Sequence, residues 1–391
     1  MQVTKRIGII MEGSKIDNLG RPTRAEIDLD ALGCNYRETR KKAGDKKMLA
    51  VVKANAYGHG AVEVSKELER LGADFFGVAI LQEGIELRNA KIKKPILLLN
   101  GIFRGEAEVV LKHDLIPVVY SLETIEELSV EAGRTGKTVP IHVKVDTGMK
   151  RLGVLPGDIE YFFKRIKELK NIKIEGLLSH FATADNKDRG FMDEQFHLFS
   201  ETIKKIRSLG FSPDHIHIEN SAAMIWNEFP NYLNLVRPGI TLYGSYPSVW
   251  FRDKIDLKPV MTLKSEIIQV KRVAQGESVS YARKFMAERD SIVGVIPVGY
   301  ADGYSRHLSN VGEVIVRGRT AKVAGLVCMD LIMIDITDIP DAGVGDEVVL
   351  WGRQGDYDIS ADELARKIGT ISYELFCRVS GRVPRVYISG Q

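Results

Sequence analysis

The sequence is poor in cysteine and contains no long apolar run. Its three cysteines, Cys34, Cys328 and Cys377, are odd in number and far apart, so they match neither a disulfide framework nor a metal-ligand spacing. This usage is typical of a reducing compartment, and we expect a cytoplasmic protein. No apolar run reaches the roughly 18 residues that a membrane span needs. Residues 1–20 lack a signal-peptide core and cleavage site, and we interpret them as a peripheral N-terminal extension.

An excess of charge of one sign is also absent. The chain has 55 basic and 52 acidic residues and a net charge of +3, without the basic run expected of a nucleic-acid-binding tail. The zinc motif H-E-x-x-H and the hydrolase motif G-x-S-x-G are missing. His215 and His217 share one face of a strand, but no third ligand is evident, so we expect no metal site. The 391 residues, 44% of them apolar, predict a globular protein of two or three domains.

From about residue 47, strand-like and helix-like segments alternate, and we expect the barrel domain that they form to span residues 32–251. Amphipathic segments at 61–71, 121–132, 158–169 and 195–209 predict helices. The eight strand candidates between them are residues 48–52, 75–80, 95–99, 116–120, 139–145, 172–179, 215–219 and 235–242. Eight such units predict an α/β fold, the (β/α)8 TIM barrel. A doubly wound sheet is the alternative, but Glu63 occupies the third glycine position of its fingerprint.

The character of the sequence changes near residue 252. Segments rich in Val, Ile and Thr predict a mostly β C-terminal domain over residues 252–388, with strands at 261–273, 291–298, 313–316, 321–335 and 347–351. Only residues 362–368 are clearly helical in pattern. Residues 21–31 alternate like a strand before the barrel begins, and we expect that strand to pair with the β domain.

Lys53 stands at the C-terminal end of the first barrel strand, followed by Tyr57 and two glycines. A strand-end lysine can simply extend to water. A partly desolvated lysine on a rigid element can instead form a Schiff base. The other strand ends favour the second interpretation, because TIM barrels gather their chemistry there. Those ends carry Lys144, Arg151, Ser179, His180, Glu219, Asn220, Ser221, Arg237, Gly239 and Ile240. Hydroxyls and backbone N–H groups among them could hold a phosphate.

The chain resembles the alanine racemases, fold-type III enzymes that use pyridoxal 5′-phosphate (PLP). The resemblance covers roughly residues 21–388. It rests on residues 21–32, 51–60 (VVKANAYGHG), 144–153 (KVDTGMKRLG), 176–185, 236–244 (VRPGITLYG), 279–281, 298–304 and 328–330. The combination of these motifs is far more specific than the stretch around Lys53 alone.

The resemblance implies a set of roles. Lys53 holds PLP and acts as one acid/base, and Tyr281 from the partner subunit of a homodimer acts as the other. Arg237 faces the pyridine nitrogen with support from His180. Further cofactor contacts match Tyr57, Asn220, Ser221, Gly239, Ile240 and Tyr373. Substrate contacts match Arg151, Met329 (through its backbone, beside Cys328), Asp330 and Tyr300, the last forming a narrow entrance with Tyr373. Lys144 matches a lysine that can be carbamylated beside Arg151, and a simple ion pair with Asp146 is the alternative.

A racemase needs bases on both faces of its substrate, and lysine and tyrosine, with reference pKa values near 10.4 and 10, both need tuning for that work. The implied function is interconversion of L- and D-alanine, which supplies D-alanine for peptidoglycan. A racemase of broader specificity, for serine or basic amino acids, is the closest alternative. A PLP-homeostasis protein would lack residues 252–388, and a decarboxylase would place an acid where Arg237 stands. A pure interaction protein would bind no PLP.

Overall fold

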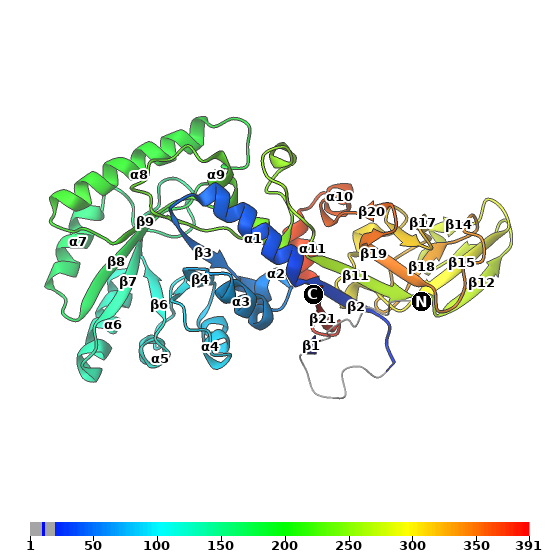
Figure 1. Ribbon diagram of the computed structural model, residues 1–391, viewed down its shortest axis with the longest axis horizontal. Coiled ribbons are helices and arrows are strands. Elements are labelled where there is room, and N and C mark those ends of the chain that lie inside the picture. Colours follow the sequence, from blue (N-terminus) through cyan, green and yellow to red (C-terminus); the bar gives the residue numbers. More distant parts are fainter. Residues whose placement is uncertain (1–9, 12–19, 391) are drawn as a thin grey trace.

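The computed structural model describes residues 10–11 and 20–390. Residues 1–9, 12–19 and 391 lie outside the described residues, and with them lies most of the expected N-terminal extension. The molecule is elongated, with a helix-wrapped barrel at one end and a β-rich domain at the other (Figure 1). No helix in the described part of the chain is long and apolar enough to cross a membrane.

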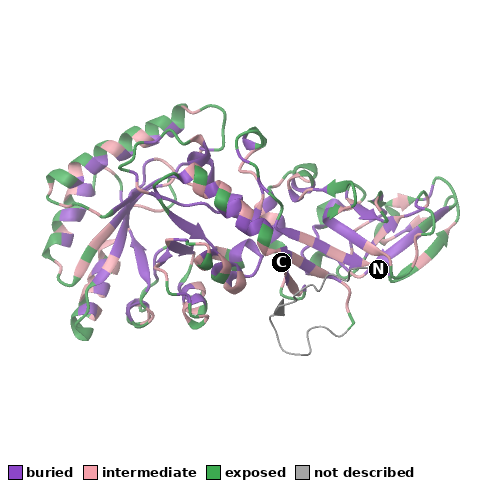
Figure 2. Cartoon of the chain, viewed as in Figure 1, coloured by how far each residue is buried: buried purple, intermediate pink, exposed green. Residues whose placement is uncertain are grey.

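Eight parallel strands form the barrel sheet in the order β10-β3-β4-β5-β6-β7-β8-β9. A bridge between Asn220 and Arg237, just beyond β9 and β10, closes the ring. Each of the eight strand candidates within residues 32–251 therefore contributes a strand to this TIM-like barrel. Their bounds are β3 Lys47–Val51, β4 Phe75–Val78, β5 Ile96–Leu98, β6 Ile116–Val119, β7 Val139–Lys144, β8 Ile172–Leu178, β9 His215–His217 and β10 Leu235–Val236. The strands are buried along most of their length (Figure 2), as expected for a parallel sheet covered by helices.

The last strand is much shorter than the expected 235–242. It ends at Val236, and a 3-10 helix, η1, runs over Ile240–Tyr243. The cause is Pro238, which has no N–H for a strand ladder, followed by Gly239 at φ −127° and ψ −86°. The chain therefore turns across the mouth of the barrel immediately after Arg237.

Helices cover the outside of the barrel (Figure 1). The four predicted helices are present as α3, α6, α7 and α8. Besides the short α2 described below, the helices of this half of the described chain are α1 Leu29–Ala43, α3 Ala61–Arg70, α4 Leu81–Asn89, α5 Ala107–Lys112, α6 Leu122–Thr135, α7 Ile159–Glu168, α8 Gly190–Ser208 and α9 Ser221–Trp226. Helix α1 was not predicted, and it takes over residues 29–31 of the expected strand 21–31. The sequence does contain capping residues for this helix. Asp28 accepts a hydrogen bond from the Ala31 N–H at 2.8 Å, and Gly44 ends the helix at positive φ.

The β domain is built on an 11-stranded sheet of the described residues. Strand β2, Arg24–Asp28, lies between β11 and β21, so the expected pairing of this early segment with the β domain is confirmed. Ile10–Met11 (β1) pairs with β21 at the edge of the sheet. The remaining strands are β11 Met261–Glu266, β12 Gln269–Val273, β15 Ser291–Ile296, β16 Glu313–Val316, β17 Arg319–Val323, β18 Ile332–Asp335, β19 Glu347–Gln354, β20 Tyr357–Ile359 and β21 Arg385–Ile388.

Two long predicted strands are each divided. Segment 261–273 becomes β11 and β12, and segment 321–335 becomes β17 and β18 with a loop that carries Met329. The separate hairpin β13 (Ser278–Val279) and β14 (Phe285–Met286) flanks Tyr281. Helix α10, Ala361–Lys367, matches the predicted helix. A second helix, α11 (Ser372–Arg378), was not predicted, and it carries Tyr373 back toward the barrel.

Candidate active site

A cavity of about 660 Å³ opens at the C-terminal ends of the barrel strands. Residues that directly follow β3, β5, β7, β8, β9 and β10 line it, and helix α11 adds Tyr373 and Cys377. The strand ends that the sequence singled out therefore converge on one cavity. The expected residues that share this cavity are Lys53, Tyr57, Lys144, Arg151, His180, Asn220, Ser221, Arg237, Gly239, Ile240 and Tyr373.

The chain after β3 winds into a left-handed turn. Ala54, Asn55, Ala56 and Tyr57 all have φ between 52° and 54°, and this element, α2 (Lys53–Tyr57), directly follows Lys53. A left-handed conformation costs roughly 1–2 kcal/mol for each residue that carries a Cβ. Four consecutive residues in this region therefore hold appreciable strain, and strain of this kind concentrates at functional sites.

Close packing behind the turn holds it in place. Gly58 continues at φ 80°, and a Cβ on it would lie 2.1 Å from the carbonyl oxygen of Phe376. His59 is fully buried, and its Nδ1 donates to the Tyr57 carbonyl at 2.9 Å. Burial lowers the pKa of His59 to about 4, so the ring stays neutral and keeps one N–H for this bond. Only glycine at position 58 lets helix α11 approach so closely.

Lys53 is partly buried in the cavity wall. Burial lowers the pKa of its amine, the nearby Arg151 lowers it further, and the Glu83 carboxylate opposes both effects. A lysine whose ammonium form is disfavoured in this way has a larger share of free amine near neutral pH. Free amine is the form that attacks a carbonyl and that accepts a proton.

Lys144, the last residue of β7, is buried and points into the same cavity. Burial, Arg151, Arg237 and Lys53 lower its pKa to about 8. The expected alternative, an ion pair with Asp146, is not formed. The Asp146 carboxylate instead accepts hydrogen bonds from the Gly148 N–H at 2.8 Å and the Lys150 N–H at 3.1 Å. Lys144 thus faces other cations with little compensating charge.

Arg237 lies buried at the base of the cavity. Its Nη2 donates to the carbonyl oxygens of Ser179 at 2.8 Å and Ile218 at 3.0 Å, and lies 3.2 Å from Nδ1 of His180. Burial lowers its pKa to about 10, which still leaves the guanidinium charged at neutral pH. Because a guanidinium only donates, Nδ1 of His180 accepts, and burial beside Arg237 lowers the pKa of His180 well below its usual value.

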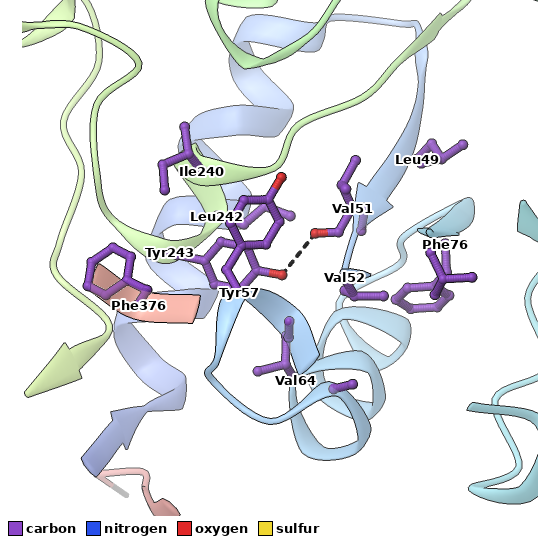
Figure 3. Packing of buried hydrophobic residues seen from close by; sticks show 14 of the residues in the cluster. Leu49, Val51, Val52, Tyr57, Val64, Phe76, Ile240, Leu242, Tyr243 and Phe376 are labelled. Carbon is purple, nitrogen blue, oxygen red and sulfur yellow. Dashed lines mark hydrogen bonds between the residues drawn. The ribbon is translucent and has the colours of Figure 1, made fainter. Parts of the chain in front are cut away.

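Hydroxyl groups also line the cavity. The Ser221 hydroxyl accepts the Gly239 N–H at 2.9 Å. A Cβ on Gly239 would lie 2.6 Å from the Tyr57 hydroxyl oxygen, so only glycine lets the backbone approach this phenol. The Tyr57 ring packs against Tyr243 at 4.8 Å between centroids and against Tyr373 at 5.8 Å. Tyr243 itself donates to the Val51 carbonyl at 2.9 Å (Figure 3).

The two halves of the chain match two descriptions of one family. "Alanine racemase, N-terminal domain" matches residues 27–247, and "Alanine racemase, C-terminal domain" matches residues 260–387. The chain belongs to the alanine racemase family. Its members are PLP-dependent isomerases that racemise alanine. The alanine racemase of Geobacter sulfurreducens is 48% identical over 378 residues, which are 94% of this chain and 98% of that protein. The alanine racemase of Halothermothrix orenii is 46% identical over 94% of this chain and 97% of that protein.

Solved alanine racemase structures share the whole architecture. The enzyme of Clostridium difficile 630 superposes with a TM-score of 0.88 at 38% identity, over 95% of this chain and 97% of that one. The enzyme of Bacillus anthracis, solved with bound L-Ala-P, superposes with a TM-score of 0.88 at 34% identity, over 95% and 96% of the two chains. The barrel and the β domain thus recur together in this family.

Within this alanine racemase fold, four expected site residues lie outside the barrel cavity. Tyr281, Met329 and Asp330 line a separate hollow of about 480 Å³ on the β domain, together with Ser280, Cys328 and Leu331. Tyr300 lines another depression with Arg306 and Arg378. The residues Tyr281, Met329 and Tyr300 are 70%, 53% and 43% exposed. One chain of this racemase therefore presents its expected site as three separate surfaces.

Sequence reasoning missed several polar residues that support the cavity. His142 and Glu175 lie behind Arg237 on strands β7 and β8, and Glu83 lies beneath the Lys53 turn. A polar side chain inside an otherwise apolar strand, such as His142 in β7, was a usable signal. Glu83 gave none, because a glutamate in the first turn of a helix is ordinary.

Proposed function

We propose that this protein interconverts L- and D-alanine with PLP held in the barrel cavity. The observation that carries the proposal is the convergence, in one cavity, of the Lys53 amine, the hydroxyl wall around Tyr57 and Ser221, and the Arg237 guanidinium. Family membership supports alanine as the substrate. The D-alanine formed would supply peptidoglycan. The cytoplasmic location expected from the cysteine usage stays a prediction.

The residues present fit PLP. Lys53 supplies an amine for the aldehyde, and the glycine at 239 leaves room beside the Tyr57 phenol for a phosphate, with Asn220, Ser221, Ile240 and Tyr373 around it.

Arg237, supported by His180, would face the pyridine nitrogen. When bound, PLP withdraws electrons from the substrate α-carbon and makes its hydrogen acidic. Arg237 keeps its own proton at neutral pH, so it donates a hydrogen bond and limits the charge that the ring can accept. A pyridine ring that accepts less negative charge would favour racemisation over transamination.

Two bases on opposite faces of the substrate would move the proton. Lys53 serves one face, since its lowered pKa lets the amine accept a proton and return it. Tyr281 of the partner subunit serves the other face. Tyr281 is exposed on the β domain and does not line the cavity of its own chain. A head-to-tail C2 homodimer would place each β-domain hollow over the other barrel.

Substrate contacts would come from these three surfaces. Arg151 in the cavity would hold the carboxylate, aided by Met329 and Asp330 of the partner subunit. Tyr373, with Tyr300 of the partner subunit, would narrow the entrance and favour a side chain as small as a methyl group.

A direct assay tests this function. The purified PLP-loaded protein should racemise alanine far faster than serine, lysine or arginine when D-enantiomer formation is followed on a panel of L-amino acids. Equal rates on serine or basic amino acids would support the broader racemase instead. No racemisation of any amino acid by protein that binds PLP stoichiometrically would refute the proposal.

A further inference from the structure

Glu83 joins the ends of two neighbouring barrel strands. It is the third residue of α4, and its Oε2 accepts the Ala79 N–H at 2.7 Å and the Ile80 N–H at 3.3 Å. Its Oε1 accepts the Ala54 N–H at 2.6 Å. Ala54 is the first residue of the left-handed turn and directly follows Lys53. One carboxylate thus ties the loop after β4 to the turn that carries Lys53.

The two carboxylate oxygens of Glu83 have different roles. Oε2 caps the start of α4, where Ile80 has no side-chain acceptor of its own, and a glutamate at this position commonly reaches back in this way. The bond from Ala54 to Oε1 contributes nothing to α4. It secures the first amide of a strained turn whose first two residues, Ala54 and Asn55, are exposed to solvent. A second hydrogen bond stabilises the turn farther along the chain, because the Oδ1 of Asn55 accepts the Ala61 N–H at 2.7 Å.

We propose that Glu83 is a positioning residue for Lys53, and that its Oε1 holds the left-handed turn in the conformation that keeps the Lys53 amine in the cavity. This inference rests on the proposed function, since it names a support for the same lysine. Glu83 itself does not line the cavity, so it acts through the backbone of Ala54. Its negative charge also opposes the loss of the proton from Lys53, because it raises the pKa that burial lowers.

Two variants separate this role from that of an ordinary helix cap. Glu83→Ala removes both functions. Glu83→Asp keeps the charge and can still reach the nearby Ala79 and Ile80 amides, but it is one methylene too short for Ala54. Glu86→Ala is the matched control, since Glu86 is exposed one turn further along the same helix. If Glu83 is only a cap, Glu83→Asp should behave like this control.

The first readout uses full-length protein without added PLP. Amide hydrogen exchange should accelerate at least tenfold in the peptide covering residues 53–58 in Glu83→Asp, while the peptide covering 81–89 exchanges as in wild type. The pH profile for modification of Lys53 by acetic anhydride, read by mass spectrometry, should move away from the wild-type profile in both Glu83 variants and not in the control. Unchanged exchange at 53–58 together with an unchanged Lys53 profile would overturn the proposal.

The second readout uses the PLP-loaded enzyme. A displaced lysine should lower kcat for alanine by about ten- to a hundredfold. The KM should change by less than about twofold, because Arg151 and the other proposed substrate contacts lie on other strands. A wild-type protein without racemase activity would refute the proposed function, but the exchange and modification experiments would still decide the role of Glu83.

Discussion

Arg237 donates from Nη1 to Nδ1 of His217 across 2.8 Å. A guanidinium only donates, so Nδ1 of His217 accepts and the His217 proton sits on Nε2. Nε2 lies 2.9 Å from Nδ1 of His142, and it therefore donates to that atom. His142 in turn carries its proton on Nε2, 3.6 Å from the Glu175 carboxylate. Burial lowers the pKa of both histidines. Two neutral rings thus lie between the cation in the cavity and the partly buried Glu175 carboxylate.

Replacing His217 should destabilise the protein. His217→Phe leaves the buried Arg237 Nη1 group without its acceptor, and an unsatisfied buried donor costs roughly 1–3 kcal/mol. We expect a loss of that size in the free energy of unfolding, measured by urea denaturation with PLP absent. His197→Phe on the exposed face of α8 is the matched control and should stay within about 0.5 kcal/mol of wild type. Equal stability of the two variants would contradict this reading of the hydrogen-bond chain.

The stability of the protein should fall as the pH drops from 6.5 toward about 4 in part because of His59. Its folded pKa lies below the unfolded value, so only the unfolded chain gains a proton in this window. Each such group contributes a slope of up to about 1.4 kcal/mol per pH unit. In denaturant titrations, His59→Asn should reduce the slope of the free energy of unfolding against pH by the contribution of one proton. Between pH 7.5 and 8.5 both proteins should show the same slope, and a difference confined to that higher range would argue against the assignment.

Lys144 should react with CO₂. A pKa of about 8 leaves more free amine near neutral pH than an ordinary lysine has, and the amine and CO₂ form a carbamate and release one proton. The resulting negative charge would pair with Arg151, where the ammonium is repelled. ¹³C NMR in labelled bicarbonate should show one carbamate signal in wild type that is missing in Lys144→Arg. A signal that persists in the variant would assign the adduct to another amine.

Mixing two inactive variants should restore activity if Lys53 and Tyr281 come from different chains. Lys53→Ala and Tyr281→Ala should each be nearly inactive. In a mixed dimer one site combines both lesions, and the other combines an intact lysine with an intact tyrosine. Random exchange of equal amounts makes about half of the dimers mixed, so roughly a quarter of all sites should recover activity. A mixture that stays inactive after confirmed subunit exchange would show that both residues act within one chain.

Periodicity and strand-end position predicted the barrel and most of its cavity. The eight barrel strands were visible because buried parallel strands are short apolar runs. Lys53, Lys144, His180, Ser221 and Arg237 lie at or shortly after the ends of these strands. Pattern alone did not predict the end of β10 at Pro238 or helix α11, since both depend on how the chain crosses the barrel mouth. The bonds from Glu83 to Ala54 and from His217 to His142 join residues 29 and 75 positions apart. Their side-chain directions are fixed only by the folded barrel.

Strand β2 has a consequence for how the protein is made. It is synthesised before the barrel, but its two partners, β11 and β21, are more than 200 residues further along the chain. The barrel can therefore fold on the ribosome while both edges of β2 are still unpaired. Unpaired strand edges promote association with other chains. Strand β2 gains its second partner only after β21, Arg385–Ile388, has been synthesised. Deletion of β21 should therefore impair the pairing of β2, which is synthesised long before it.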